Sequence, residues 1–168
     1  MTQEKTVGLV GIGLVGTALA ENLLANGFDV IGFARREAKR AELKHLGGWP
    51  AASLDEVAQK VERVILSLPD SNVVEEVVLG PDGLLQAGTG LRVIIDTTTG
   101  EPERTEVLAA RLLAQGIQLL DAPISGSSEQ IRRREGVVLI GGERTAYESC
   151  LDLFTVLSQK HYYLGGPG

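Results

Sequence analysis

Short runs of valine, isoleucine and leucine alternate along this chain with segments that carry a helical pattern. Strands whose apolar residues are continuous, rather than interleaved with polar ones, are typical of a parallel sheet that is buried on both faces. The sequence therefore predicts an α/β fold, a doubly wound and mainly parallel sheet with helices on both faces. The expected strands are Thr6–Val10, Val30–Ala34, Val64–Leu68, Val93–Thr97, Ile117–Leu120, Val137–Ile140 and, more weakly, His161–Leu164.

Several of the intervening helices carry recognisable start or stop signals. Ser53 and Glu56 have the spacing of a capping box, in which each side chain accepts a hydrogen bond from the other residue's free backbone N–H. A proline at the first position begins a helix over 102–115, and a glycine follows its end. We expect a last long helix over about 144–159, where apolar residues recur at core spacing.

Composition and charge exclude some classes of protein. A chain of 168 residues that is 43% hydrophobic is large and apolar enough to form one domain with a hydrophobic core. The net charge of −6 argues against a general nucleic-acid or anionic-membrane binder, so any basic site must be local. Cys150 has no second cysteine to pair with, and this usage favours a cytoplasmic location.

The apolar stretch from Val7 to Ala20 imitates the core of a signal peptide. The leader before it, MTQEK, has no net positive charge, and four glycines interrupt the stretch in a way that suits a tight turn better than an apolar helix. We therefore expect no signal peptide. We also expect no membrane-spanning helix, because no apolar segment is long enough and free enough of charged residues to span a membrane.

Unusual residues gather where the expected strands end. Glycines follow the first strand, two arginines follow the second, and the segments SLPD (67–70), DTTTG (96–100) and DAPISGS (121–127) end three later ones. The carboxyl ends of parallel strands share one edge of a sheet, and ligands of doubly wound folds bind in the crevice outside that edge. Five separate segments therefore converge on one expected site.

The glycines form the pattern Gly11-x-Gly13-x-x-Gly16 between the first strand and a helix over 17–26. The first glycine permits a sharp turn, the second lets the backbone approach a pyrophosphate, and the third allows close packing of helix on strand. A helix N-terminus also supplies free N–H groups and a positive dipole end. The pattern predicts a Rossmann dinucleotide site, with cofactor contacts from Gly11, Ile12, Gly13, Leu14, Val15 and Gly16.

The end of the second strand indicates which dinucleotide is bound. NAD enzymes commonly place an acidic residue there for the ribose hydroxyls, whereas this chain has Ala34 followed by Arg35 and Arg36, with Lys39 one turn later. Cations at a helix N-terminus oppose the helix dipole unless an anion compensates. We therefore expect these four residues to surround the 2′-phosphate of NADP, with NAD less favoured; the alternative is a solvated basic helix start.

Together these segments resemble the cofactor domain of the β-hydroxyacid dehydrogenases, the family of 3-hydroxyisobutyrate dehydrogenase and 6-phosphogluconate dehydrogenase. The resemblance covers essentially the whole chain. The family's Asn-Arg-Thr in NADP users falls on Ala34, Arg35 and Arg36, of which only the arginine is kept. Its Leu-Pro pair falls on Leu68 and Pro69, which the resemblance places beside the nicotinamide.

The resemblance also implies a small 3-hydroxyacid-type substrate, held by Thr99, Ser125, Gly126 and Ser127, with Thr99 contacting the cofactor as well. Ser127 stands where the family has a second glycine, and Gln130, Ile131 and Arg134 replace small residues, so the substrate wall is bulkier and more basic. For Arg132, Arg133 and Arg134 we expect a solvated helix face paired to Glu129 and Glu135, with direct substrate contact as the alternative.

The expected catalytic group is missing from the chain. Reduction of a carbonyl needs a proton donor, which the family takes from a lysine of a second, helical domain. Only Lys39 among the lysines follows a strand end, and it lies at the phosphate end. We therefore expect residues 1–164 to be the cofactor domain and 165–168 to begin the junction to an absent helical domain. The parent would be a homo-oligomeric NADP-dependent dehydrogenase, and this piece alone would be inactive and hold no metal.

Two alternatives stay open at this point. The segment TTGEP also resembles the imine reductases, which use NADPH but lack the Ala-Pro-x-Ser-Gly segment. The domain could also be a nucleotide-binding module that never had a catalytic half.

Overall fold

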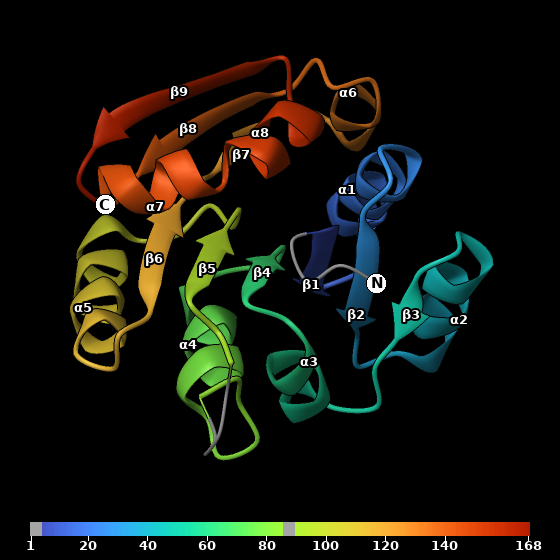
Figure 1. Ribbon diagram of the computed structural model, residues 1–168, viewed down its shortest axis with the longest axis horizontal. Coiled ribbons are helices and arrows are strands. Elements are labelled where there is room, and N and C mark those ends of the chain that lie inside the picture. The colour runs from blue at the N-terminus through green and yellow to red at the C-terminus, as the bar shows by residue number, and fades with distance from the viewer. Residues whose placement is uncertain (1–4, 86–89) are drawn as a thin grey trace.

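A computed structural model describes residues 5–85 and 90–168, and in them a nine-stranded sheet has the order β3-β2-β1-β4-β5-β6-β8-β7, with β9 beside β8 (Figure 1). The first four residues of the expected domain, which are most of the leader, lie outside the described residues. The strands are β1 Thr6–Val10, β2 Asp29–Phe33, β3 Trp49–Pro50, β4 Arg63–Leu66, β5 Val93–Asp96, β6 Gln118–Asp121, β7 Ile124–Ser125, β8 Val137–Gly141 and β9 Lys160–Gly165.

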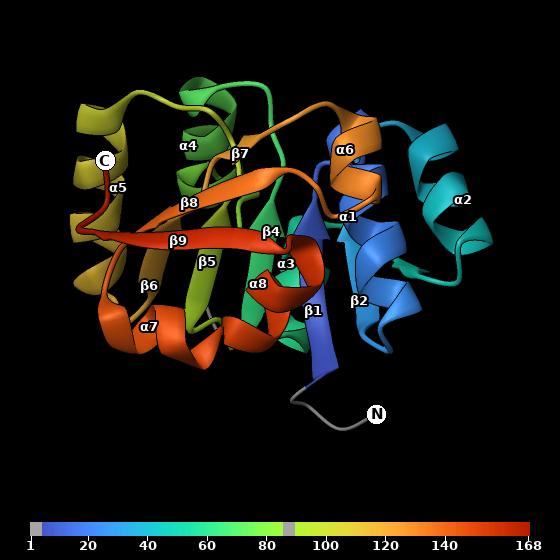
Figure 2. The ribbon, with the colours of Figure 1, turned by 90° about the horizontal axis from the view of Figure 1, so that it is seen from above.

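The six strands from β3 to β6 are parallel, and the first reversal of direction comes at β8. β8 runs antiparallel to β6 and to β7, while β9 runs parallel to β8. Figure 2 shows β8 and β9 side by side, running across the direction of β1, β4 and β5. The mainly parallel sheet with helices on both faces confirms the predicted fold class.

Helices cover both faces of the sheet because each central strand alternates between two apolar cores. In β4, Ile65 joins the core on the side of α1 and α8, whereas Val64 and Leu66 join the core on the side of α3, α4 and α5. The helices are α1 Leu14–Ala25, α2 Glu37–His45, α3 Leu54–Lys60, α4 Ser71–Leu79, α5 Pro102–Leu113, α6 Ser128–Arg132, α7 Arg144–Ser149 and α8 Leu151–Leu157.

Some local predictions need correction. The single helix expected over 144–159 is wrong, because the backbone at Cys150 leaves the helical conformation (φ −113°, ψ 10°) and separates α7 from α8. At α3 the Ser53 hydroxyl accepts the Glu56 N–H at 3.1 Å as expected, but the Glu56 carboxylate accepts from Ala52 at 2.7 Å instead of completing the box. Among the helices that the structure describes, none is long and apolar enough to cross a membrane.

Candidate functional site

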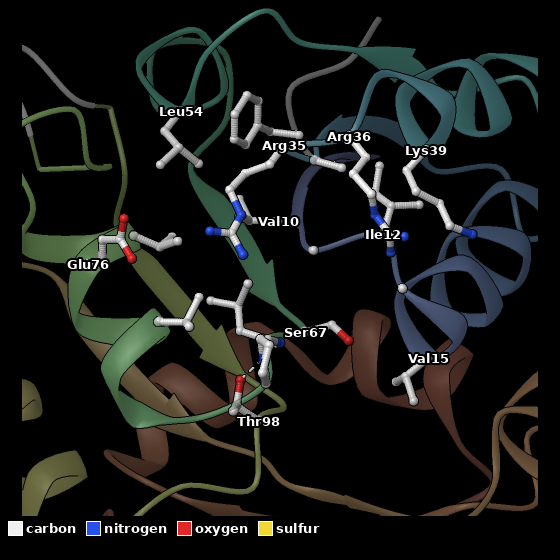
Figure 3. A pocket seen from close by; sticks show the side chains of 18 of the residues that line it. Val10, Ile12, Val15, Arg35, Arg36, Lys39, Leu54, Ser67, Glu76 and Thr98 are labelled. Atoms are coloured by element: carbon white, nitrogen blue, oxygen red, sulfur yellow. Dashed lines mark hydrogen bonds between the residues drawn. The ribbon is translucent and has the colours of Figure 1, made fainter.

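A cleft of about 1060 Å³ lies over the carboxyl ends of β1, β2, β4 and β5 (Figure 3). Four of the predicted positions do not line it: Gly16, Ser125, Gly126 and Ser127. The predicted residues that do line it are Gly11, Ile12, Gly13, Leu14, Val15, Ala34, Arg35, Arg36, Lys39, Leu68, Pro69 and Thr99. The structure therefore brings the four expected cofactor segments together at one edge of the sheet.

The three glycines of the first loop have different surroundings. Gly11 has φ +95°, and a Cβ there would lie 2.1 Å from the Ser67 carbonyl oxygen. A Cβ at Gly16 would lie 1.9 Å from the Gly11 carbonyl oxygen, whereas one at Gly13 would meet nothing within 4 Å. Gly11 and Gly16 therefore let the turn pack against itself and β4, while Gly13 leaves space open in the cleft.

The same loop leads into α1, whose N-terminus faces the cleft. Gly13 is the N-cap residue, no side chain caps the helix, and its first turn contains no acidic residue. The first N–H groups of an α-helix have no partner within the helix, and together with the helix dipole they favour an anion. Because no side chain among the described residues accepts from these N–H groups, this end of α1 is suited to a phosphate group.

Arg35 and Arg36 follow β2 and reach into the cleft from its rim (Figure 3). Within residues 5–85 and 90–168 neither guanidinium has a hydrogen bond or ion pair with another side chain. Arg40, which sequence reasoning overlooked, instead donates from Nη1 to the carbonyl oxygens of Ala34 at 2.6 Å and Arg35 at 3.1 Å. Arg40 thus holds the loop in place and leaves two cationic groups available for a ligand.

Lys39 lines the cleft but does not add a free charge to it. Its Nζ lies 2.5 Å from a carboxylate oxygen of Glu42 in the same helix, and this contact is the main reason that the pKa of Glu42 is lowered. The expected contact of Lys39 with a 2′-phosphate stays a prediction. The available positive charge of this rim comes from the arginines.

Threonines connect the ends of β4 and β5 at the opposite end of the cleft. The Leu68 N–H donates to Thr98 Oγ1 at 3.2 Å, and the Thr97 hydroxyl donates to the Leu66 carbonyl oxygen at 2.7 Å. Thr97 and Thr98 are buried, whereas Thr99 is exposed in the cleft. These bonds fix the Leu68–Pro69 segment and leave the Thr99 hydroxyl to face a ligand.

A buried acid, Asp96, and a half-buried one, Asp121, lie at the ends of β5 and β6, and their pairing was not anticipated. Asp96 and Asp121 are register partners on β5 and β6. Burial raises the pKa of Asp96 to about 6, although hydrogen bonds from Thr98 oppose the rise, and the charge of Asp121 adds to it. Burial also raises the pKa of Asp121, which accepts the Gly168 N–H at 3.1 Å. The sequence signal that could have predicted this pair is an aspartate at the end of each of two consecutive strands.

The expected substrate residues Ser125, Gly126 and Ser127 lie next to Ile124, which lines the cleft. Ser127 caps α6: its hydroxyl accepts the Gln130 N–H at 3.3 Å, and its own N–H donates to Gln130 Oε1 at 2.9 Å. This capping box was missed at the sequence level. A role of the segment in substrate binding stays a prediction.

The three arginines that follow have separate environments. Arg132 pairs with Glu21 at 2.5 Å and Glu129 at 3.1 Å, and Arg133 pairs with Glu129 at 3.0 Å, so the expected pairing to Glu129 is confirmed. Arg134 lies beyond the helix with φ +61° and donates to the Thr155 carbonyl oxygen in α8. Arg134 therefore does not belong to a solvated helix face, and in the described part of the chain Glu135 has no ion pair.

Comparisons with known proteins agree with this geometry. Residues 6–165 match the family described as the NAD binding domain of 6-phosphogluconate dehydrogenase. The chain is 29% identical over 168 residues to 2-(hydroxymethyl)glutarate dehydrogenase of Eubacterium barkeri, covering 100% of this chain and 56% of that protein. The structure of 3-hydroxyisobutyrate dehydrogenase from Salmonella typhimurium is 26% identical with a TM-score of 0.87, over 97% of this chain and 57% of that one.

An imine reductase from Streptomyces aurantiacus is nearly as similar in structure. It is 26% identical with a TM-score of 0.86, over 95% of this chain and 55% of the reductase. The chain thus spans little more than half the length of the proteins that it matches.

Proposed function

The chain belongs to the β-hydroxyacid dehydrogenase family, as the NAD-binding domain shared with 6-phosphogluconate dehydrogenase, and from this premise we propose that it binds NADP(H) in preference to NAD(H). The observation that carries the preference is at the end of β2. Ala34 has no side-chain acceptor there, and the guanidinium groups of Arg35 and Arg36, which have no side-chain partner among the described residues, line the cleft. A ribose hydroxyl pair needs an acceptor there, whereas a 2′-phosphate needs cations. The site therefore suits the phosphorylated cofactor.

The other contacts follow from the geometry of the cleft. The pyrophosphate would lie against the uncapped N-terminus of α1, in the space that Gly13 leaves open. The 2′-phosphate would accept hydrogen bonds from Arg35 and Arg36, which present planar, permanently charged donors. The nicotinamide would lie by Pro69 and Thr99, at the end of the cleft away from the arginines.

For the whole protein, we infer an oxidoreductase that transfers a hydride between NADP(H) and a small 3-hydroxyacid-type substrate. The bound cofactor supplies the hydride chemistry. In this chain, Thr99 would orient the reacting end of the substrate through its exposed hydroxyl, and Ser125 and Gly126 would contact the rest from the adjacent rim. The resemblance assigns proton transfer to a lysine of a following helical domain; of the residues that line the described cleft, only Lys39 is a lysine, and Glu42 pairs with it.

A second candidate is an imine reductase, favoured by the near-equal structural similarity to the Streptomyces aurantiacus enzyme. Both candidates require the same cofactor half and differ in the group that is reduced, a carbonyl or an imine. A parallel assay of the full-length protein with 3-hydroxy acids and with cyclic imines distinguishes them. Oxidation of the hydroxy acid supports the first candidate, and reduction of the imine alone supports the second.

Cofactor preference is tested by titrating NADPH and NADH into the protein and following the fluorescence of the reduced nicotinamide. A hydrogen bond to a charged group contributes about 1.5–3 kcal/mol, so losing the 2′-phosphate should weaken binding about tenfold to a hundredfold. Equal dissociation constants would refute the role of the arginines, and absence of binding of either nucleotide would refute the dinucleotide site.

A further inference from the structure

One face of α4 lines the cleft beside the arginines, and it carries a single charged side chain. Val73, Glu76 and Val77 of α4 line the cleft together with the C-cap residue Gly80. Glu76 and Val77 lie three and four residues after Val73 and four and three residues before Gly80, the spacing of neighbours on one helical face. Two valines would give a flat, apolar wall with one small terminal residue. Glu76 places a carboxylate in the middle of this wall.

Within the part of the chain that the structure describes, the Glu76 carboxylate has no hydrogen-bond or ion-pair partner. Its neighbour Glu75 differs, because it pairs with Arg104 at 2.8 Å on the other side of the helix, and that hydrogen bond lowers its pKa. Figure 3 shows Glu76 and Arg35 on facing sides of the pocket, with Leu54 at its upper edge. Glu76 is therefore a free acceptor directed at whatever lies between α4 and the end of β2.

The chemistry of the cofactor limits what can lie there. A carboxylate repels the phosphates, which have cationic or N–H partners at Arg35 and at the N-terminus of α1. Adenine is attached to the ribose carbon next to the one that bears the 2′-phosphate, so the base must lie beside the arginines. Leu54, Val73 and Val77 also line this cleft, and their apolar side chains suit the faces of an aromatic ring.

We propose that Glu76 recognises the adenine base by accepting a hydrogen bond from its exocyclic 6-amino group. This inference rests on the proposed function, because it requires an adenine dinucleotide in the cleft. A carboxylate only accepts hydrogen bonds, so it favours a base with an amino group at this position and disfavours one with a carbonyl oxygen there. Glu76 would thus select adenine over hypoxanthine, independently of the arginines that select the phosphate.

The test compares NADPH with reduced nicotinamide hypoxanthine dinucleotide phosphate, in which a carbonyl oxygen replaces the 6-amino group. Wild type should bind NADPH about three- to tenfold more tightly, the range of one net hydrogen bond at a solvent-accessible site. Glu76→Gln should bring this ratio close to one, because an amide can accept from the amino group and donate to the carbonyl oxygen. Glu76→Ala should reduce the ratio as well.

Asp82→Asn is the matched control, since Asp82 also lines the cleft just beyond α4 and loses the same charge in this variant. It should keep the wild-type ratio, which separates a specific contact from a general change in charge. Wild type that binds both nucleotides equally, or a ratio that Glu76→Gln leaves unchanged, would overturn the role of Glu76 while leaving NADPH binding intact. Wild type that binds neither nucleotide would overturn the proposed function together with this inference.

Discussion

Substitution of Gly13 by valine separates cofactor binding from folding more cleanly than any other change in the glycine loop. The backbone at Gly13 has φ −82° and ψ −161°, which a residue with a side chain adopts without strain. Apart from its two chain neighbours, a Cβ there meets no atom of the described residues within 4 Å. The free energy of unfolding should therefore change by no more than about 1 kcal/mol, which corresponds to about 2–4 °C in Tm for a domain of this size.

Binding should respond much more strongly. The added methyl groups would fill the space needed by the pyrophosphate, and the N–H groups at the start of α1 would lose their contacts with it. Losing two hydrogen bonds to a charged group, at about 1.5–3 kcal/mol each, would weaken NADPH binding by more than about a hundredfold. Fluorescence titration with NADPH measures the affinity, and a thermal melt without cofactor measures the stability.

Gly11→Ala and Gly16→Ala provide the contrast. Their Cβ atoms would lie 2.1 Å and 1.9 Å from backbone oxygens, so both variants should melt at lower temperature even without cofactor. A folded Gly13→Val protein with undiminished NADPH affinity would show that the loop is only a turn. A Gly13→Val protein that fails to fold would show that the open space at Gly13 has been misread.

Three further predictions concern charge, pH and catalysis. Arg35→Asp should reverse the cofactor preference toward NADH with little change in Tm, because an acid then faces the ribose hydroxyls in place of the 2′-phosphate; titration of both nucleotides tests this, and an unchanged preference would count against it. Since burial raises the pKa of Asp96 to about 6, its contribution to stability is present below about pH 4 and is lost as the pH rises through about 6. The free energy of unfolding of Asp96→Asn, relative to that of wild type, should thus rise by up to about 3 kcal/mol between about pH 4 and pH 7. Urea denaturation of both proteins across this pH range measures the difference, and a difference that does not change with pH would contradict the raised pKa of Asp96. Residues 1–168 saturated with NADP⁺ should oxidise no 3-hydroxy acid above background in an absorbance assay, because general acid–base catalysis contributes about a hundredfold to ten-thousandfold; robust turnover would mean that the acid lies within this chain.

The fold and the cofactor half of the site were predictable because their signals are local. β1 and the glycine loop combine a continuous apolar run, a fixed glycine spacing and a following helix, and each part supports the others. β3 and β7 were missed because strands of two residues carry no periodicity. The division of the expected last helix at Cys150 was missed because no glycine or proline marks it. The chain changes direction there, and α8 buries Leu153 and Phe154 in the core.

The remaining features of the site depend on where the side chains lie once the chain is folded. Lys39 looks free in the sequence, and its pairing with Glu42 follows from side-chain placement on α2. Glu76 reads as an ordinary solvated residue until α4 is placed against the cleft. The raised pKa of Asp96 requires the burial that β5 and β6 create together.

The central claim is that the two arginines after β2 hold a 2′-phosphate, and the most direct measurement is the ratio of NADH to NADPH dissociation constants in wild type and in the double variant Arg35→Ala/Arg36→Ala. Wild type should show a ratio of about ten to a hundred, and the double variant a ratio near one with little change in its affinity for NADH. Arg133→Ala, which removes an exposed arginine paired to Glu129 on α6, should leave the ratio unchanged. A wild-type ratio of one, or a double variant that keeps the wild-type ratio, would contradict the account.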